Sequence, residues 1–493
     1  MKRIMKPALL TVAIAIGLSA CATAKKSSDY DLDFSKQRGS AKTMQVNGET
    51  VAYRAYENIV YVQKPVDTVY QSINIYIPEA YFNGGSINGF TADTAPIFFP
   101  NQVGGYMPGK PGEPGKAGFG PSTGKADAMQ VALSQGYIVA SPGARGRTSS
   151  SGKAPAAIVD LKAAVRYLKA NDKVMPGDAG KIISNGTSAG GALSVLLGAS
   201  GNSADYEPYL RSLGAAEAGD DIFAVSAYCP ITILEHADAA YEWQFNGIKD
   251  YQSMNISMLD YKVERKLVPG TLTDAQVKLS DALKPQFPPY VNSLGLKDAA
   301  GRPLALDKNG NGSFKRYVEA HIMKSAQKQL DAGKDLSDRK WLAIRNGKVT
   351  GMDFFAYAKA AGRMKTPPAF DAVDLSAGEN QLFGTATVDK QHFTAFSQQH
   401  NTAEGATRAD EHTVKLMNPM YYIGQAQNPQ NWRIRVGTAD RDTSLAIASL
   451  VSAKLENSGK TVDFAMPWDQ PHSGDYDLDE LFAWMKQVSA QAK

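Results

Sequence analysis

The chain contains very little cysteine, since Cys21 and Cys229 are the only two among 493 residues. Two cysteines cannot supply the disulfide framework on which small secreted domains depend. The chain also has little net charge, because its 53 Lys and Arg residues are nearly balanced by 49 Asp and Glu. No basic stripe alternates with aromatic residues, so we expect no nucleic-acid partner. The fold must therefore rest on a hydrophobic core, and 43% hydrophobic residues are enough for a large one.

The N-terminus lacks an apolar run long enough to cross a bilayer. Residues 8–16 are apolar but too few to span a membrane, and three basic residues lie among the first six. The run is followed by Leu18-Ser-Ala-Cys21, which resembles a bacterial lipobox. This pattern predicts a lipoprotein signal peptide over residues 1–21, with lipid attached to Cys21 after cleavage. The alternative is an ordinary signal peptide with a chance cysteine.

A lipid on Cys21 would anchor an exported protein to a membrane. The residue after Cys21 is Ala22 and not Asp, and by resemblance to lipoprotein sorting rules this favours the outer membrane. Residues 22–44 are polar and are expected to form a flexible tether. With Cys21 lipidated, Cys229 has no intramolecular partner, and its strand-like surroundings indicate a buried packing residue.

Strand-like and helical patterns alternate from about residue 46 to residue 230. The run 155–170, for example, has apolar residues at helical spacing, and it is flanked by short apolar runs typical of buried strands. Such alternation predicts an α/β protein with a doubly wound, mostly parallel sheet. Longer helical patterns then dominate until strand character returns at 432–436. We expect a core of residues 45–234 and 413–493, interrupted by a large, mainly helical cap insertion at 235–412.

The first chemical motif is a G-x-S-x-G pattern. Residues 186–190 read Gly-Thr-Ser-Ala-Gly, between a short strand pattern and a helix rich in small residues. They resemble the nucleophile elbow of α/β-hydrolases, in which a tight strand-to-helix turn lifts the serine above the sheet. Ser122 satisfies the same pattern but lies in a Pro/Gly-rich loop. We therefore predict Ser188 as the nucleophile of an α/β-hydrolase fold; the alternative is a small-residue turn without chemistry.

The base and the acid follow from the chain order nucleophile, acid, histidine in this fold. Of six histidines, only His472 comes late enough to leave room for an acid after the strand 432–436. Asp440 is the first acid after that strand, and we predict that it orients His472. Asp442, two residues later, remains the rival acid.

The oxyanion that forms during acyl transfer needs two N–H donors. The first is expected from Ala189, directly after the nucleophile. The second is expected from Gly104 or Gly105, in the loop that follows the strand pattern 97–99, where this fold places its oxyanion loop. A plain glycine turn is the alternative for this pair.

These motifs together resemble the bacterial tannases, α/β-hydrolases with a large cap that act on gallate esters. The resemblance rests on residues 100–105, 185–191, 363–365, 379–380, 437–442 and the His472 loop. It implies that Lys365, Glu379 and Asp442 grip the galloyl hydroxyls and that Ile231 lies against the ring. Carboxylates accept from phenolic O–H groups and an ammonium donates to phenolic oxygens, so the residue types suit that ligand. Ordinary surface charge is the alternative for the two cap residues.

The resemblance thus implies an esterase for small aromatic, galloyl esters that needs no cofactor. Three alternative functions stay open: a broader carboxylesterase or feruloyl-type esterase, a serine peptidase, and a binding lipoprotein without catalysis.

One further sequence pattern concerns a possible metal site. Asp307, Asn309 and Asn311 open like an EF-hand loop, but Val318 stands where the loop requires Glu. A structural calcium ion or a simple Asn/Gly turn would explain it.

Overall fold

The computed structural model describes residues 29–116, 125–259, 262–424 and 427–491. The predicted signal peptide with Cys21, and the rival serine Ser122, lie outside these residues. Within them, no helix is long and apolar enough to cross a membrane.

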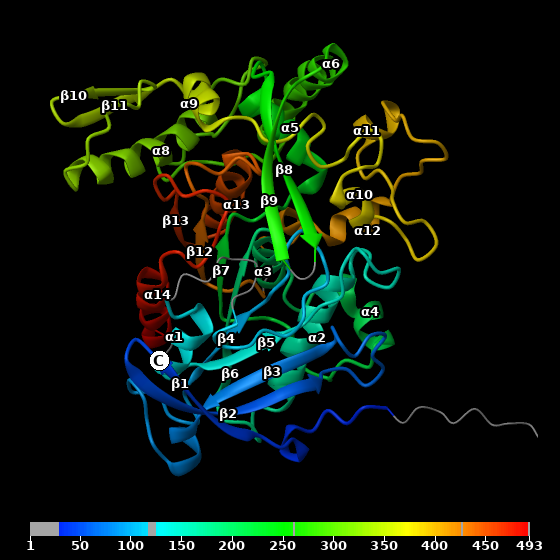
Figure 1. Cartoon of the computed structure of the whole chain (residues 1–493), viewed down its shortest axis with the longest axis vertical. Coiled ribbons are helices and arrows are strands. Elements are labelled where there is room, and N and C mark those ends of the chain that lie inside the picture. The colour runs from blue at the N-terminus through cyan, green and yellow to red at the C-terminus, as the bar shows by residue number, and fades with distance from the viewer. Residues whose placement is uncertain (1–28, 117–124, 260–261, 425–426, 492–493) are drawn as a thin grey trace, which may run out of the picture.

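A nine-stranded sheet forms the centre of the molecule (Figure 1). Its spatial order is β1-β2-β3-β5-β4-β6-β7-β12-β13. All neighbours from β5 to β13 pair in parallel, whereas β1, β2, β3 and β5 pair antiparallel. The predicted α/β fold with a mostly parallel sheet is therefore confirmed. The strands are β1 (Ser40–Val46), β2 (Glu49–Val60), β3 (Ser72–Pro78), β4 (Pro96–Pro100), β5 (Ile138–Pro142), β6 (Asp178–Thr187), β7 (Ala224–Tyr228), β12 (Asn431–Arg435) and β13 (Thr461–Ala465).

Helices cover both faces of this sheet because the central strands are apolar on both sides. In β4, Ile97 and Phe99 pack into one hydrophobic core, while Phe98 between them packs into the other. The first core includes α2 (Ala156–Ala170), α3 (Ala189–Ala199) and α13 (Leu445–Asn457). The second includes α1 (Ala128–Ser134) and α14 (Leu478–Gln491). This double winding places the carboxyl ends of the parallel strands at one edge, where loops carry function.

The polar segment before the sheet differs from the prediction of a flexible tether up to residue 44. The strand β1 already begins at Ser40, and Phe34 is buried in a short 3-10 helix (Phe34–Lys36). Asn171 at the end of α2 holds this segment: its Oδ1 accepts from the Phe34 N–H at 2.8 Å, and its Nδ2 donates to the Leu32 carbonyl at 2.9 Å. The polar composition did not reveal that Phe34 is buried and that Asn171 binds this stretch, so the described residues 29–44 belong to the folded domain.

We expect the Asn171→Ala variant to lower the free energy of unfolding by about 1–3 kcal/mol, because it leaves the buried Phe34 N–H without its acceptor. Urea denaturation of the variant and of the unchanged protein measures the difference. Equal unfolding midpoints and slopes would contradict the docking of this segment.

Between β7 and β12 the chain leaves the sheet and forms a second layer above it (Figure 1). Most of its elements are helices, but the antiparallel hairpins β8–β9 and β10–β11 also belong to it, and these were not predicted. The elements are α5 (Leu234–Phe245), β8 (Asp250–Leu259), β9 (Lys262–Thr271), α6 (Asp274–Leu283), α7 (Phe287–Ser293), α8 (Ser313–Asp331), β10 (Leu342–Arg345), β11 (Lys348–Met352), α9 (Phe354–Ala361), α10 (Gly378–Leu382), α11 (Ala395–Gln399) and α12 (Glu411–Leu416). The predicted boundaries at 235 and 412 fall at the start of α5 and inside α12.

Candidate active site

Ser188 stands at the turn between β6 and α3. Its backbone has φ 62° and ψ −120°, a conformation that L-residues rarely adopt and that is typical of a strained functional turn. The turn requires glycine on both sides. A Cβ on Gly186 would lie 2.3 Å from the Gly190 carbonyl oxygen, and one on Gly190 would lie 2.7 Å from that of Val103. The elbow geometry expected of the motif is thus present at Ser188.

A hydrogen-bonded relay runs from Ser188 to an acid. The His472 Nε2 lies 2.8 Å from the Ser188 Oγ, and the His472 Nδ1 lies 2.8 Å from the Asp440 Oδ2. Asp440 is fully buried, in the loop after β12. Asp442, the rival acid, instead donates its backbone N–H to the Asp440 Oδ1 at 2.9 Å. The structure therefore joins His472 to the first of the two predicted acids.

Backbone contacts hold the loops of this relay together. The Ala439 N–H donates to the Gln470 carbonyl at 3.1 Å, which ties the acid loop to the histidine loop. The two loops touch at Gly437, where a Cβ would lie 1.9 Å from the Gln470 oxygen. Glycine is the only residue that permits this approach, so the stretch after β12 fixes both Asp440 and His472.

The pKa of His472 reflects two opposing effects. Burial lowers the pKa, but the Asp440 carboxylate raises it, and the result lies well above the ordinary value for histidine. A base must be neutral to take a proton, and His472 becomes neutral only as the pH rises through this raised pKa.

We therefore expect the acidic limb of kcat/KM to have its midpoint above about 6.5, the pKa of an unperturbed histidine. Initial rates of ester hydrolysis, measured at several pH values between about 5 and 9, locate the midpoint of this limb. A midpoint at or below that of free histidine would contradict the pairing with Asp440.

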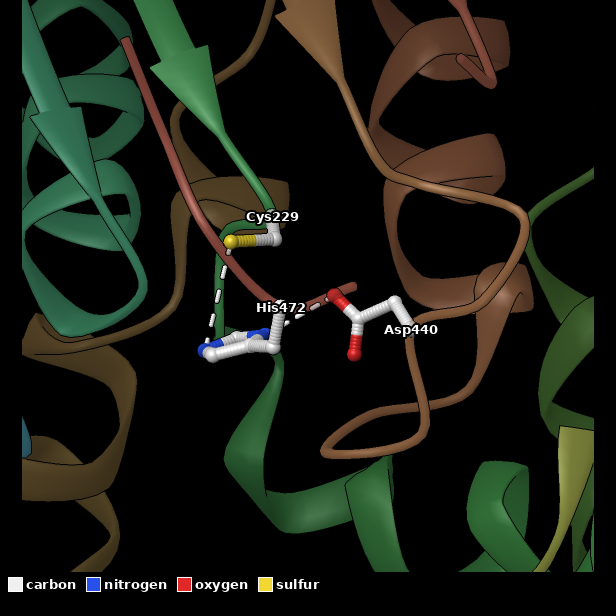
Figure 2. Close-up of side chains that lie close together, drawn as sticks. All are labelled: Cys229, Asp440 and His472. Carbon is white, nitrogen blue, oxygen red and sulfur yellow. Dashed lines mark hydrogen bonds and ion pairs between the residues drawn. The ribbon is translucent and has the colours of Figure 1, made fainter. Parts of the chain in front are cut away.

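Cys229 is buried, as predicted, but it also contacts the relay (Figure 2). Its Sγ lies 3.4 Å from the Ser473 carbonyl, to which it donates, and 3.9 Å from the His472 Nε2. Burial raises the pKa of the thiol, so it stays protonated. Cys229, Asp440 and His472 offer three possible metal ligands within 4.8 Å of one another. Both ring nitrogens of His472 already face Asp440 and Ser188, so His472 and Asp440 belong to the proton relay, and Cys229 packs against it.

The predicted oxyanion donors lie beside the elbow. Ala189 is the first residue of α3, so its N–H has no acceptor within the helix. The loop that carries Gly104 and Gly105 packs on the same turn, because the Asn101 Nδ2 donates to the Gly190 carbonyl at 3.0 Å. Arg147 fixes the far side of this loop by donating from Nε to the Gly105 carbonyl at 2.7 Å. The choice between the two glycines as second donor stays a prediction.

Ile231 lies next to the nucleophile. Its N–H donates to the Ser188 carbonyl at 3.2 Å, and its own carbonyl accepts from the Tyr106 hydroxyl at 2.8 Å. Burial raises the pKa of Tyr106, and the negative charge of Glu379 raises it further. Glu379 lies in the first turn of α10. Nothing in the sequence pairs Tyr106 with Ile231, and this hydrogen bond was not predicted.

Lys365 is linked to the loop of Asp440 through Tyr241. Its backbone N–H donates to the Tyr241 hydroxyl at 3.1 Å, and that hydroxyl donates to the Arg441 carbonyl at 2.9 Å, one residue after Asp440. The Lys365 ammonium lies 4.0 Å from the centre of the Phe370 ring.

Three charged groups on these loops are thus free to meet a ligand. Among the described residues, Lys365, Glu379 and Asp442 form no ion pair. They are half-buried, so part of each residue is accessible. Asp442 bonds directly to Asp440, and Lys365 is tied to the same loop through Tyr241. The role of all three residues in binding a galloyl ring stays a prediction.

A buried carboxylate, also missed, fixes the segment between Lys365 and Glu379. Asp371 is fully buried and accepts from the Asn380 Nδ2, the His392 Nδ1 and the Thr394 Oγ1, each at 2.7 Å. Charge-assisted hydrogen bonds of this kind are strong and directional. Since Asn380 follows Glu379 directly, Asp371 holds the position of that carboxylate.

The loop considered as a calcium site is a turn in which the Asp307 carboxylate binds backbone N–H groups of the same loop. The Asp307 Oδ1 accepts from the backbone N–H groups of Asn309 and Asn311, at 2.8 and 3.0 Å. The Lys315 ammonium donates to the Asn311 Oδ1 at 3.0 Å, which places a positive charge where a cation would bind. These contacts favour the alternative reading, a simple turn before α8.

Comparison with known proteins places the chain in a family. A family model described as BD-FAE matches residues 119–266. No curated protein matches the chain. The tannase of Fusobacterium nucleatum is 53% identical, covers 94% of this chain and 100% of its own, and superposes with a TM-score of 0.89.

Two further solved structures agree. A tannin acyl hydrolase in complex with ethyl gallate is 47% identical, with 93% and 99% of the two chains covered and a TM-score of 0.87. The tannase of Lactobacillus plantarum is 46% identical, with 93% and 100% covered and a TM-score of 0.89. At this identity over nearly the full length of both chains, the resemblance noted from the motifs is confirmed. The chain belongs to the tannase family, with the fold of an α/β-hydrolase.

Proposed function

We propose that this protein hydrolyses galloyl esters through an acyl-enzyme on Ser188. The observation that carries the proposal is the hydrogen-bonded relay of Ser188, His472 and Asp440 in a chain of the tannase family. The relay is the arrangement that activates a serine in acyl transfer. A related tannin acyl hydrolase has been solved with ethyl gallate, which supports the same class of ester here.

In the first half of the reaction, the His472 Nε2 takes the proton of the Ser188 hydroxyl. The Oγ attacks the ester carbonyl carbon, and the carbonyl oxygen becomes an oxyanion held by the Ala189 N–H and by Gly104 or Gly105. Asp440 stabilises the imidazolium through the 2.8 Å contact at Nδ1. When the intermediate collapses, His472 gives the proton to the leaving alcohol, and the galloyl group stays on Ser188.

In the second half, a water molecule replaces the alcohol. His472, neutral again, takes a proton from this water, whose oxygen attacks the acyl carbon. The ester bond to Ser188 breaks, the Oγ regains the proton, and gallate leaves. Every step uses side chains and backbone N–H groups of the chain, so the chemistry requires no metal or cofactor.

The galloyl ring is recognised by the three charged groups on the surrounding loops. Glu379 and Asp442 accept from phenolic O–H groups, and the Lys365 ammonium donates to a phenolic oxygen. Ile231, which is buried and bonded to the Ser188 carbonyl, offers an apolar contact for the ring. A site with such polar groups rejects an acyl group that lacks the hydroxyls.

Three esters separate the proposal from its rivals. The purified protein should hydrolyse methyl gallate with a far higher kcat/KM than methyl ferulate or ethyl butyrate. Preference for ferulate would indicate a feruloyl-type esterase, and equal rates on all three a broad carboxylesterase. Cleavage of a peptide amide in preference to any ester would indicate a peptidase. No reaction of Ser188 with a fluorophosphonate probe would leave only a binding protein.

We also propose that the mature protein is a lipoprotein anchored through Cys21 to the outer membrane. The lipobox-like sequence before Cys21 and the Ala that follows it support this. In a bacterial host, the protein should incorporate labelled palmitate and fractionate with outer membranes, and Cys21→Ser should lose both. An unlabelled protein in the periplasmic fraction would contradict the proposal.

A further inference from the structure

A groove opens in the cap, between the open end of the hairpin β8–β9 and the C-terminal end of α9. Its volume is about 850 Å³. Neither Ser188 nor His472 lines it, and it was not predicted from the sequence. A groove of this size accepts a group larger than one aromatic ring.

Two aromatic rings form its walls. Phe355 on α9 is 51% exposed, so much of its side chain is accessible to a ligand. Tyr251 on β8 lies flat on the hairpin, because a Cβ on Gly270 would meet the Tyr251 ring at 2.3 Å. The Phe355 ring lies in the same way beside Gly247, at 3.3 Å from the position of a Cβ. Phe355 is exposed and Tyr251 half-buried, so both rings can offer a face for stacking.

The charge of the groove is predominantly positive. Lys249, Lys359 and Arg441 line it, and none of them forms an ion pair among the described residues. Arg363 also lines it but is neutralised by the buried Glu242. The only acid in the lining, Asp250, accepts from the Thr271 hydroxyl at 2.8 Å. The groove therefore favours an aromatic ligand rich in oxygen acceptors.

Two chain segments, one with Arg441 and one with Arg363, line the groove and also carry predicted active-site residues. Arg441, which lines the groove, stands between Asp440 and Asp442. Arg363, also in the lining, donates from Nε to the Lys365 carbonyl at 2.8 Å, and its own carbonyl accepts from the Gln252 N–H at 3.0 Å. The segments that carry Asp440 and Lys365 therefore also carry residues of the groove.

We infer that this groove is a second aromatic subsite, which holds a further galloyl ring of an ester that carries several such groups. The inference rests on the proposed function. The ring stacks on Phe355 and Tyr251, and its phenolic oxygens accept from Lys249, Lys359 and Arg441. An ester with one ring, such as methyl gallate, fills the active site alone and leaves the groove empty. The groove thus sets the preference for substrates with several rings.

The test compares two substrates in one variant. In Phe355→Ala/Lys359→Ala, both changed side chains are exposed and lie outside the catalytic relay. We expect KM for pentagalloylglucose to rise about three- to tenfold, the effect of losing one aromatic contact. The kinetics on methyl gallate should stay unchanged. The matched control is Tyr30→Ala/Lys324→Ala, which removes an exposed aromatic and an exposed lysine elsewhere and should alter neither substrate.

The outcomes separate the groove from the proposed function. If the unchanged protein hydrolyses methyl gallate but the variant keeps its KM for pentagalloylglucose, the groove is no subsite and the galloyl esterase stands. An equal loss on both substrates would likewise overturn the subsite, because the effect would then be general. If the unchanged protein hydrolyses no galloyl ester, both proposals fail.

Discussion

Replacing Ser188 by alanine should lower kcat on methyl gallate by about 10⁶-fold, the typical loss when the nucleophile of a serine relay is removed. The residual rate comes from the oxyanion donors and from binding. His472→Ala should lose nearly as much, and the double variant little more, because the two groups act as one unit through the 2.8 Å contact. Initial rates with purified proteins measure these losses.

The chain provides its own control. Ser122→Ala changes the other serine of a G-x-S-x-G pattern and should keep full activity. Fluorophosphonate labelling should likewise vanish in Ser188→Ala and persist in Ser122→Ala. Loss of activity in the Ser122 variant, or strong residual activity in Ser188→Ala, would contradict the assignment of the nucleophile.

The second large effect concerns the galloyl ring. Lys365→Met and Glu379→Gln should each lower kcat/KM on methyl gallate by about 10- to 100-fold, the loss of one charge-assisted hydrogen bond. On ethyl butyrate both variants should stay close to the unchanged protein, because a short alkyl acyl group meets neither side chain. The ratio of the two kcat/KM values therefore measures recognition of the ring apart from catalysis.

Lys324→Met is the matched control, since it removes an exposed cap lysine on α8. It should leave the ratio unchanged. Equal losses on both esters in the Lys365 and Glu379 variants would mean that these residues support the fold or the relay and do not contact the ring.

The catalytic centre was predictable because its signals are local. The glycines around Ser188 are required by contacts at 2.3–2.7 Å, and such tight turns leave a short pattern in the sequence. The loops that carry Ser188, Asp440 and His472 gather at the carboxyl edge of the parallel sheet, and their chain order is that of the α/β-hydrolase motif. Spacing alone could not decide firmly whether Asp440 or Asp442 is the acid of the relay, because the two lie only two residues apart. The contact between the His472 Nδ1 and the Asp440 Oδ2 distinguishes them.

The cap was less predictable because its order depends on contacts between distant residues. Asp371 stabilises the segment beside Glu379 through His392 and Thr394, and no periodic pattern marks such a buried hub. The hairpin β8–β9 was missed for a related reason. Two paired strands that extend from the core carry no apolar run of the kind that marks a buried strand.

The most direct test of the galloyl esterase is the ratio of kcat/KM for methyl gallate to that for methyl benzoate, measured on the unchanged protein. The two esters share the reacting carbonyl, the ring and the leaving alcohol, and differ only in the three hydroxyls. Because Lys365, Glu379 and Asp442 would be left without partners by benzoate, we expect a ratio of about 10³ or more. A ratio near one would show that the hydroxyls are not recognised, and the protein would then be an esterase of another specificity.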